Sequence, residues 1–187
     1  MSGRAGLVIA VLLLLAPVLL LPGLAWGAAG RLRPVWYPPE WLNAARLIDG
    51  SRGTGKVLLL PWTAYRRPAW NGGRALLDPW PRLLSRQVIW NDGPQVGNVQ
   101  MMADDPAARR LNAVIAAPGP LTPALKAAGV RFVIADGGPG GFAGAPASGG
   151  TGNGGVPGLA GRLPGATVVA TAPGLVVYRL PSGPAGR

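Results

Sequence analysis

The side chains that could do chemistry in this chain of 187 residues gather in one tryptophan-rich block, residues 61–100. The block interleaves flat aromatic rings with arginine and asparagine donors and with carboxylates, a combination that stacks on sugar rings and binds anionic groups. It is our candidate ligand-binding surface, with the residues Trp62, Tyr65, Arg66, Arg67, Trp70, Asn71, Arg74, Asp78, Trp80 and Asp92. A simpler interpretation stays open, in which these Trp residues fill a small core or dock on a bilayer surface.

Carboxylates are the remaining candidate acids and bases, because the sequence contains no histidine and no cysteine. Disulfides, thiolate nucleophiles, imidazole bases, zinc fingers, haem ligation and His-containing triads are thereby excluded. Asp78 and Asp92 occur in Asp-Pro and Asp-Gly dipeptides that favour turns, and Asp104 with Asp105 fits the start of a helix. An enzyme that uses Asp78 or Asp92 in glycosyl chemistry stays an alternative. We expect no catalytic residue in the chain alone, no metal and no cofactor.

Residues 50–56 read GSRGTGK and match the G-x-x-x-x-G-K part of a phosphate-binding loop. Val57 follows the lysine, where such a loop needs a Ser or Thr hydroxyl for magnesium. The segment should also end a helix and open a strand, whereas a phosphate-binding loop follows a strand and opens a helix. We therefore expect a helix end and a turn here.

Lysine and arginine outnumber aspartate and glutamate by 18 to 7, which gives a formal net charge of +11. The chain is therefore drawn to polyanions. Its cations are scattered singly or in pairs, and no recognition motif or aromatic platform of a nucleic-acid-binding protein accompanies them. We expect no nucleic-acid partner, whereas attraction to membrane lipid or to an anionic cell-wall polymer uses the same charge.

An uncharged apolar stretch runs from Ala5 to Trp26. A helix rises about 1.5 Å per residue and the hydrocarbon core is about 30 Å thick, so roughly 20 apolar residues span a membrane. We predict a transmembrane helix or uncleaved signal anchor over residues 1–27 and an extended juxtamembrane linker over 28–39. The alternative is a cleaved signal peptide with a small-x-small site at residues 25–27.

Helix and strand signals alternate through residues 40–181. They predict helices at 40–50, near 81–85, at 104–119 and at 121–129, strands at 57–60, 87–90 and 130–135, and a terminal β-hairpin over 166–180. Thr122 is the expected N-cap of the last of these helices. The predicted fold class is α/β: an N-terminal transmembrane helix followed by one small mixed-sheet domain with covering helices and a C-terminal β-hairpin.

Residues 137–161 are nearly all Gly, Pro, Ala and Ser. Such a segment has little apolar area to offset a backbone entropy of about 1 to 2 kcal/mol per residue, so we expect a flexible insertion. Residues 182–187 should form a disordered tail. The extracytoplasmic α/β domain is thus predicted to span residues 40–181.

The order of several segments resembles a known family. These segments are YPPEW, ARLIDG, GKVLLLPW, YRRPAWN, ALLDPWPRLLSR, VIWNDG, DDPAARRL, AGVRFVIAD and GLVVYRL. Over residues 35–136 and 164–181 the succession is similar to the C-terminal extracytoplasmic region of large actinobacterial multi-spanning membrane proteins related to the GT-C class of glycosyltransferases. The resemblance is a pattern of segments without a diagnostic catalytic signature.

In such enzymes the sugar donor is a polyprenyl-phosphate sugar, and the catalytic acid lies in a loop between early membrane helices that has no counterpart in this sequence. The resemblance implies a membrane-anchored, extracytoplasmic accessory or recognition domain in cell-envelope glycan assembly, single-pass in the plasma membrane and not catalytic alone. Arg66, Arg67 and Arg74 would meet phosphate. The candidate partners are membrane lipid, a polyprenyl-phosphate sugar or anionic cell-wall glycan, and a multi-pass membrane protein. A structural tail domain that packs on such a protein is the alternative.

Overall fold

The structure, a computed structural model, describes residues 3–20, 23, 30, 34–96, 99–137 and 158–181. The chain divides into two units, Met1–Trp36 and Tyr37–Arg187. Most of the predicted insertion and the predicted C-terminal tail lie outside the described residues.

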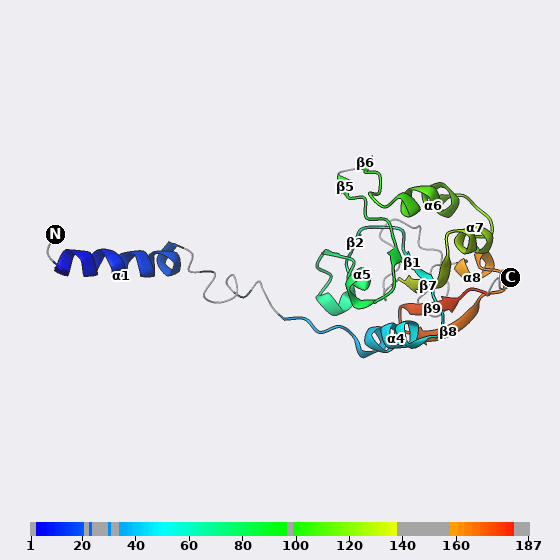
Figure 1. Cartoon of the computed structure of the whole chain (residues 1–187), viewed down its shortest axis with the longest axis horizontal. Helices are drawn as coiled ribbons and strands as arrows, with labels where there is room; N and C mark the ends of the chain where they lie inside the picture. Colours follow the sequence, from blue (N-terminus) through cyan, green and yellow to red (C-terminus); the bar gives the residue numbers. More distant parts are fainter. Residues whose placement is uncertain are drawn as a thin grey trace. The chain divides into compact units, whose positions relative to one another are not determined.

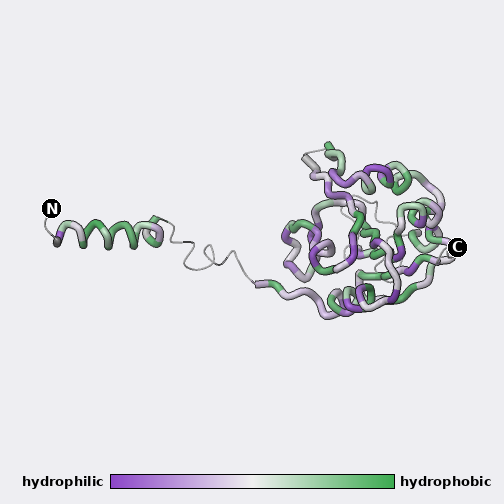
Figure 2. The backbone as a smooth tube through the Cα atoms, in the orientation of Figure 1, coloured by the Kyte–Doolittle hydropathy of each residue, from purple (hydrophilic) through white to green (hydrophobic). Residues whose placement is uncertain are grey.

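The first unit contains α1 (Gly3–Leu20), which covers most of the predicted membrane segment. Consecutive apolar side chains, among them Leu12, Leu13 and Leu14, are exposed along it, and Figure 2 shows that most of the helix is hydrophobic. Among the helices that the structure describes, none is long and apolar enough to cross a membrane. The predicted transmembrane helix is therefore not supported, and residues 1–2, 21–22 and 24–27 of the predicted segment lie outside the described ranges.

A five-stranded mixed sheet forms the centre of the second unit (Figure 1). Its order is β4 (Val88–Ile89), β1 (Lys56–Leu60), β7 (Val130–Asp136), β9 (Leu175–Arg179) and β8 (Thr167–Ala172). β1 is parallel to both β4 and β7, whereas β9 is antiparallel to β7 and to β8. The predicted mixed α/β sheet with a C-terminal hairpin is confirmed.

Helices cover both faces of this sheet. They are α4 (Pro39–Gly50) and α5 (Trp80–Leu83) on one face, and α6 (Pro106–Ala116), α7 (Thr122–Ala127) and α8 (Leu159–Arg162) on the other. Val57 and Leu59 of β1 belong to the first core, and Leu58 and Leu60 belong to the second. A strand covered on both faces is apolar throughout, which explains the unbroken run VLLL.

The tryptophan-rich block adds several short elements to these layers. They are β2 (Tyr65–Arg66), a 3₁₀ turn at Ala69–Asn71, β3 (Leu76–Leu77), β5 (Gln95–Val96) and β6 (Val99–Gln100). β2 pairs with β3 and β5 with β6, both antiparallel. Strands of two residues are too short to show an alternating pattern, so local sequence does not predict these four strands.

Two helix ends differ from their prediction. Leu121, not Thr122, is the N-cap of α7, and the Thr122 hydroxyl instead donates to the carbonyl oxygen of Pro164 at 3.1 Å. Regular structure also resumes before the end of the predicted insertion at residue 161, because α8 begins at Leu159, whose side chain is buried. Asp105 accepts a hydrogen bond from the Ala107 amide at 2.8 Å, in the expected capping role.

Candidate functional site

Most of the candidate ligand-binding residues lie in one hairpin, residues 61–80, which leaves the sheet at the carboxyl end of β1. The peptide bond between Leu60 and Pro61 is cis. Within the hairpin, Tyr65 pairs with Leu77 across β2 and β3. Because β7 is parallel to β1 and ends at Asp136, the hairpin begins beside the carboxyl ends of two neighbouring strands.

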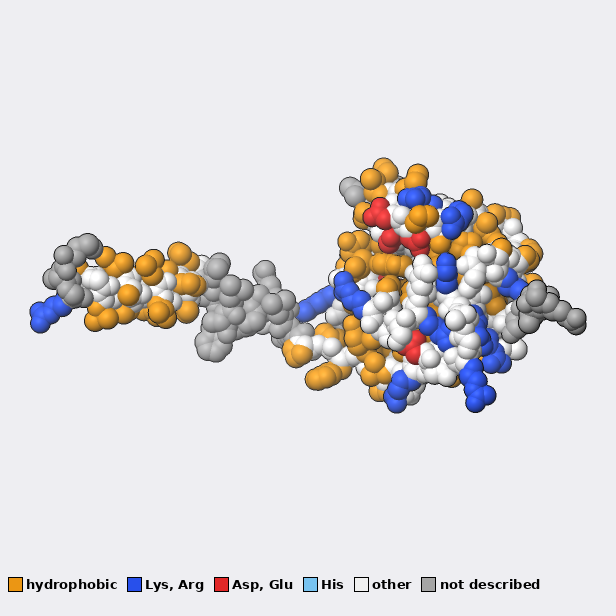
Figure 3. All heavy atoms as spheres, in the orientation of Figure 1, with side chains coloured by type: hydrophobic (Ala, Val, Ile, Leu, Met, Phe, Trp, Pro, Cys, Tyr) orange, Lys and Arg blue, Asp and Glu red, His pale blue; other side chains and the backbone are white. Residues whose placement is uncertain are grey.

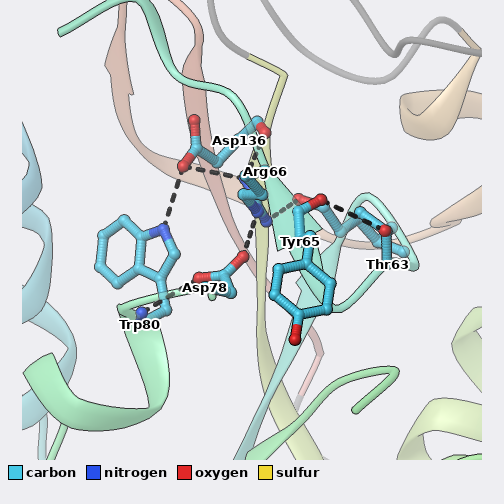
Figure 4. A network of polar contacts seen from close by, with 7 residues as sticks. Thr63, Tyr65, Arg66, Asp78, Trp80 and Asp136 are labelled. Atoms are coloured by element: carbon cyan, nitrogen blue, oxygen red, sulfur yellow. Dashed lines mark hydrogen bonds and ion pairs between the residues drawn. The ribbon is translucent and has the colours of Figure 1, made fainter. Parts of the chain in front are cut away.

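A buried polar cluster ties this hairpin to the sheet (Figure 4). We call Arg66, Asp78, Trp80 and Asp136 the Arg66 cluster. The Arg66 guanidinium forms ion pairs with Asp78, through Nε and Oδ2, and with Asp136, through Nη1 and Oδ2 at 3.0 Å. It also donates to the backbone oxygen of Asp136 and, at 3.0 Å, to that of Leu60. One side chain thus joins β2 to the ends of β1 and β7.

Trp80 closes the cluster from the first turn of α5. Its amide donates to Asp78 Oδ1 at 3.0 Å, and its indole Nε1 donates to Asp136 Oδ2 at 3.1 Å. The Trp80 ring is fully buried and stacks on Trp41 of α4, with 4.7 Å between ring centroids. The cluster is therefore packed between a helix and the sheet edge.

The electrostatics of the cluster are unbalanced, because one guanidinium faces two carboxylates. Burial raises the pKa of Asp78 from 3.8 to about 6, and Asp136 adds to this rise. Arg66 and the Trp80 amide oppose it by stabilising the carboxylate. A carboxyl group that titrates near neutrality is typical of a general acid, but only 1% of Asp78 is exposed and its contacts are internal.

The exposed part of the hairpin carries other candidate residues. Tyr65 is 52% exposed, and Figure 4 shows its ring pointing away from the cluster. Arg67 and Arg74 are exposed, and Asn71 donates from Nδ2 to the backbone oxygen of Arg74 at 3.0 Å. These side chains form an aromatic and cationic surface on the outside of the hairpin.

Trp70 lies between the interior and this surface. Its ring meets those of Tyr37 and Trp41 edge-on, at centroid distances of 5.5 and 5.4 Å. Among the described residues its indole Nε1 is buried and has no hydrogen-bond partner. A buried indole N–H is normally paired, so Trp70 is an exception to this rule among the described residues.

Trp62 and Asp92 lie apart from the hairpin's outer surface, near the carboxyl end of β4. Trp62 Nε1 donates to Asn112 Oδ1 of α6 at 2.9 Å, and its backbone oxygen accepts from Asn91 at 3.3 Å. The Asp92 carboxylate accepts from the amides of Asp104 and Asp105, at 2.9 and 3.3 Å. It therefore fixes the chain that leads into α6.

Asp136 is the residue of the site that the sequence analysis missed. The predicted strand stops at residue 135, one position too early, although an acidic residue directly after a buried strand is itself a signal for the carboxyl edge of a sheet. The connections after β1 and β4 also leave toward opposite faces, through α5 and α6. Ligand sites of open α/β sheets lie where the strand order reverses, which in the order β4-β1-β7 is between β1 and β7, beside Arg66 and Asp136.

No protein-family model matches the chain, and no curated protein matches it. Among solved structures it is similar to the arabinofuranosyltransferase AftD from Mycobacteria, with a TM-score of 0.54 and 17% sequence identity. The match covers 98% of this chain and 15% of that chain. This chain therefore shares the fold of a small part of a much longer protein.

Proposed function

We propose that this chain is an extracytoplasmic recognition domain in cell-envelope glycan assembly that is not catalytic on its own. The fold that it shares with part of AftD, a protein named as an arabinofuranosyltransferase, supports a role in glycan chemistry. The observation that carries the non-catalytic assignment is that the two candidate carboxylates, Asp78 and Asp92, are engaged in internal contacts. Asp78 is buried against Arg66, and Asp92 holds the start of α6.

The ligand would bind on the outside of the 61–80 hairpin. Tyr65 offers an exposed flat face of the kind that stacks on sugar rings. Arg67 and Arg74 would meet phosphate or carboxylate groups. This chemistry fits a polyprenyl-phosphate sugar or an anionic cell-wall glycan.

A binding experiment on the full chain tests this proposal. The probes are an arabinofuranosyl oligosaccharide and farnesyl phosphate, followed by tryptophan fluorescence. Tyr65→Ala should weaken binding of the oligosaccharide about fivefold to tenfold, because a stacking face is lost. Arg67→Gln should weaken binding of farnesyl phosphate by a similar factor. Arg110→Gln, an exposed arginine of α6, is the matched control and should leave both affinities unchanged. Equal affinities in all variants would refute the assignment of this surface.

One observation favours a catalytic alternative. The raised pKa of Asp78 would allow it to donate a proton near neutral pH if the hairpin opened. Glycosyl transfer or hydrolysis that is lost in Asp78→Asn, but kept in Asp92→Asn, would support an enzyme. Absence of turnover in the wild type leaves the recognition role in place. Turnover that survives both substitutions would refute the non-catalytic assignment and would place the catalysis on other residues.

Exposed apolar residues favour a second alternative, a tail domain that packs on a multi-pass membrane protein. Val99, Met101 and Met102, at and after β6, are 63%, 49% and 75% exposed. In such an assembly Trp70 would be shielded from aqueous quenchers and indifferent to added glycan. Quenching of the assembled complex therefore distinguishes the tail domain from the recognition domain.

We further propose that the domain lies at the outer surface of the plasma membrane. The exposed apolar residues of α1 support membrane association. Cell fractionation with and without detergent tests this location. Full-length chain in the cytosolic supernatant without detergent would rule it out.

A further inference from the structure

A second surface with a distinct chemistry lies at the amino edge of the sheet, opposite the 61–80 hairpin. The parallel strands β1, β4 and β7 begin at this edge and the antiparallel β9 ends there, so residues from separate parts of the chain meet. Six of them are cationic. We call Arg52, Lys56, Arg86, Lys126, Arg131 and Arg179 the amino-edge basic surface.

Backbone contacts hold the centre of this surface in place. Gly53 and Gly55 have positive φ angles of 83° and 149°, and a Cβ at either would come within 2.3 and 2.6 Å of the Arg131 side chain. Arg86 donates to the backbone oxygen of Gly53 at 2.9 Å. The guanidinium carbons of Arg86 and Arg131 lie 5.6 and 5.7 Å from the centroid of the Phe132 ring. Two like charges from separate segments are thus held against the loop that contains Gly53 and Gly55.

The strand register places further cations beside them. Lys56 is the first residue of β1, and its amide donates to the Gly129 oxygen at 2.9 Å. Gly129 lies two residues after the end of α7, whose last turn contains Lys126. Arg179, the last residue of β9, is exposed and pairs with Phe132 across the sheet. Since Arg52 follows the end of α4, cations from four strand ends and two helix ends share this edge.

The acidic residues lie mostly elsewhere. Asp78 and Asp136 are buried at the carboxyl ends of the strands, and Asp92, Asp104 and Asp105 surround the start of α6. In Figure 3 several Asp and Glu side chains appear near β5 and β6, whereas Lys and Arg gather on the lower right of the domain. The acidic side chains therefore lie mostly away from the amino-edge basic surface.

The two remaining acidic residues of the chain are Glu40 and Asp49. Glu40 lies in the first turn of α4, and the opposite end of this helix leads into the basic edge. Asp49 is the acidic residue nearest to that edge, and its Oδ2 accepts from the Ser85 amide and hydroxyl, both at 3.0 Å. No ion pair among the described residues neutralises any of the six cations.

We propose that the amino-edge basic surface binds the phosphate groups of an anionic lipid membrane. Clusters of four to eight Lys and Arg attract anionic headgroups, with about 1 kcal/mol from each cation near the surface. A lipid surface suits this chain better than a soluble polyanion, because α1 exposes apolar residues that add a second membrane-binding signal. The proposal does not depend on which ligand the 61–80 hairpin binds.

Vesicle binding of the full chain tests the proposal. The probes are vesicles of phosphatidylcholine alone and vesicles that also contain phosphatidylglycerol. The test variant combines Arg52→Gln, Lys126→Gln and Arg179→Gln, whose side chains make no hydrogen bond or ion pair within the described part of the chain. The control variant removes the same charge through Arg46→Gln, Arg82→Gln and Arg110→Gln.

We expect the wild type to bind the anionic vesicles more tightly than the neutral ones, and the preference to fall as salt is added. The test variant should lose roughly 100-fold of its affinity for anionic vesicles, because three cations leave the contact. Its affinity for neutral vesicles should stay unchanged, since α1 is intact. The control variant should keep most of the preference. Thermal unfolding of each variant verifies that the fold is retained.

Three outcomes would overturn the proposal. The first is equal binding of the wild type to both kinds of vesicle. The second is an equal loss of the anionic preference in the test and control variants, which would assign it to net charge alone. The third is tight binding of soluble polyphosphate without a preference for anionic vesicles, which would assign the surface to a soluble polyanion.

Discussion

The guanidinium of Arg66 and the carboxylate of Asp78 form an ion pair that is almost closed to water, with 7% and 0% of the two side chains exposed. The pair joins the two strands of the 61–80 hairpin, and Asp136 connects it to the sheet. Because Asp136 adds a second carboxylate beside one guanidinium, the cluster carries excess negative charge when both acids are ionised. Its stability should therefore depend on pH.

The Asp78→Asn variant should become more stable relative to the wild type as pH rises from 4 to 7, because the wild type loses stability over this range. The folded state raises the pKa of Asp78 from 3.8 to about 6, so it binds this proton more tightly than the unfolded chain. The stability that this bound proton gives the folded wild type is fully present below pH 3.8 and is lost as pH rises through 6. The difference in unfolding free energy between variant and wild type should change by about 3 kcal/mol across this range. Urea denaturation at several pH values measures it.

The same series on Asp104→Asn is the control, because that aspartate is exposed. The difference in unfolding free energy between Asp104→Asn and the wild type should not change with pH as the difference for Asp78→Asn does. A constant difference for Asp78→Asn at all pH values would contradict the raised pKa.

Arg66→Met should destabilise the domain strongly at neutral pH. The substitution leaves Asp78 and Asp136 buried without their shared cation, and breaking a buried pair in this way costs about 3 to 5 kcal/mol. Arg67→Met changes the neighbouring, exposed arginine and should stay within about 0.5 kcal/mol of the wild type. Urea denaturation at pH 7.5 compares the three proteins. Equal stability of both variants would show that the ion pair contributes little.

The sheet could be predicted from sequence because its central strands are local apolar runs between turn residues. β1 and β7 have such runs, and start signals such as Pro106 mark the helix that lies between them. The Arg66 cluster could not be predicted in this way. Its contact between Arg66 and Asp136 joins residues 70 positions apart. A local sequence pattern does not predict a contact between residues so far apart.

The tryptophans show the same limit within the candidate site. Trp80 and Trp70 have the same side chain, which can stack on a sugar or on another aromatic ring. The structure buries Trp80 against Trp41, whereas it leaves the Trp70 indole N–H without a partner among the described residues. Asp136 makes this distinction, because its carboxylate accepts from the Trp80 indole N–H at 3.1 Å although it lies 56 positions away in sequence.

Arg162→Ala should destabilise the carboxyl end of α6. The Arg162 guanidinium donates to the backbone oxygens of Ile115, Ala117 and Gly119, at 3.1, 2.6 and 3.0 Å. These carbonyls have no partner within the helix, so losing a charged donor should cost about 2 to 3 kcal/mol. Arg162→Lys should recover only part of this loss, because an ammonium lacks the planar fork. Arg110→Ala is the exposed control on α6, and thermal unfolding that fails to separate it from Arg162→Ala would contradict this role.

Gly93→Ala should disrupt the chain between β4 and α6 although the φ angle of Gly93 is not in the left-handed region. A Cβ at this position would come within 2.3 Å of the Met101 backbone oxygen, and backbone cannot yield as a flexible side chain does. Overpacking of this kind costs about 1 to 3 kcal/mol. Gly50→Ala is the control, since nothing lies within 4 Å of its Cβ position. Urea denaturation should separate the two variants, and hydrogen exchange should rise at the amides of Asp104 and Asp105, which Asp92 holds. Equal stability of the two alanine variants would show that the segment adjusts without cost.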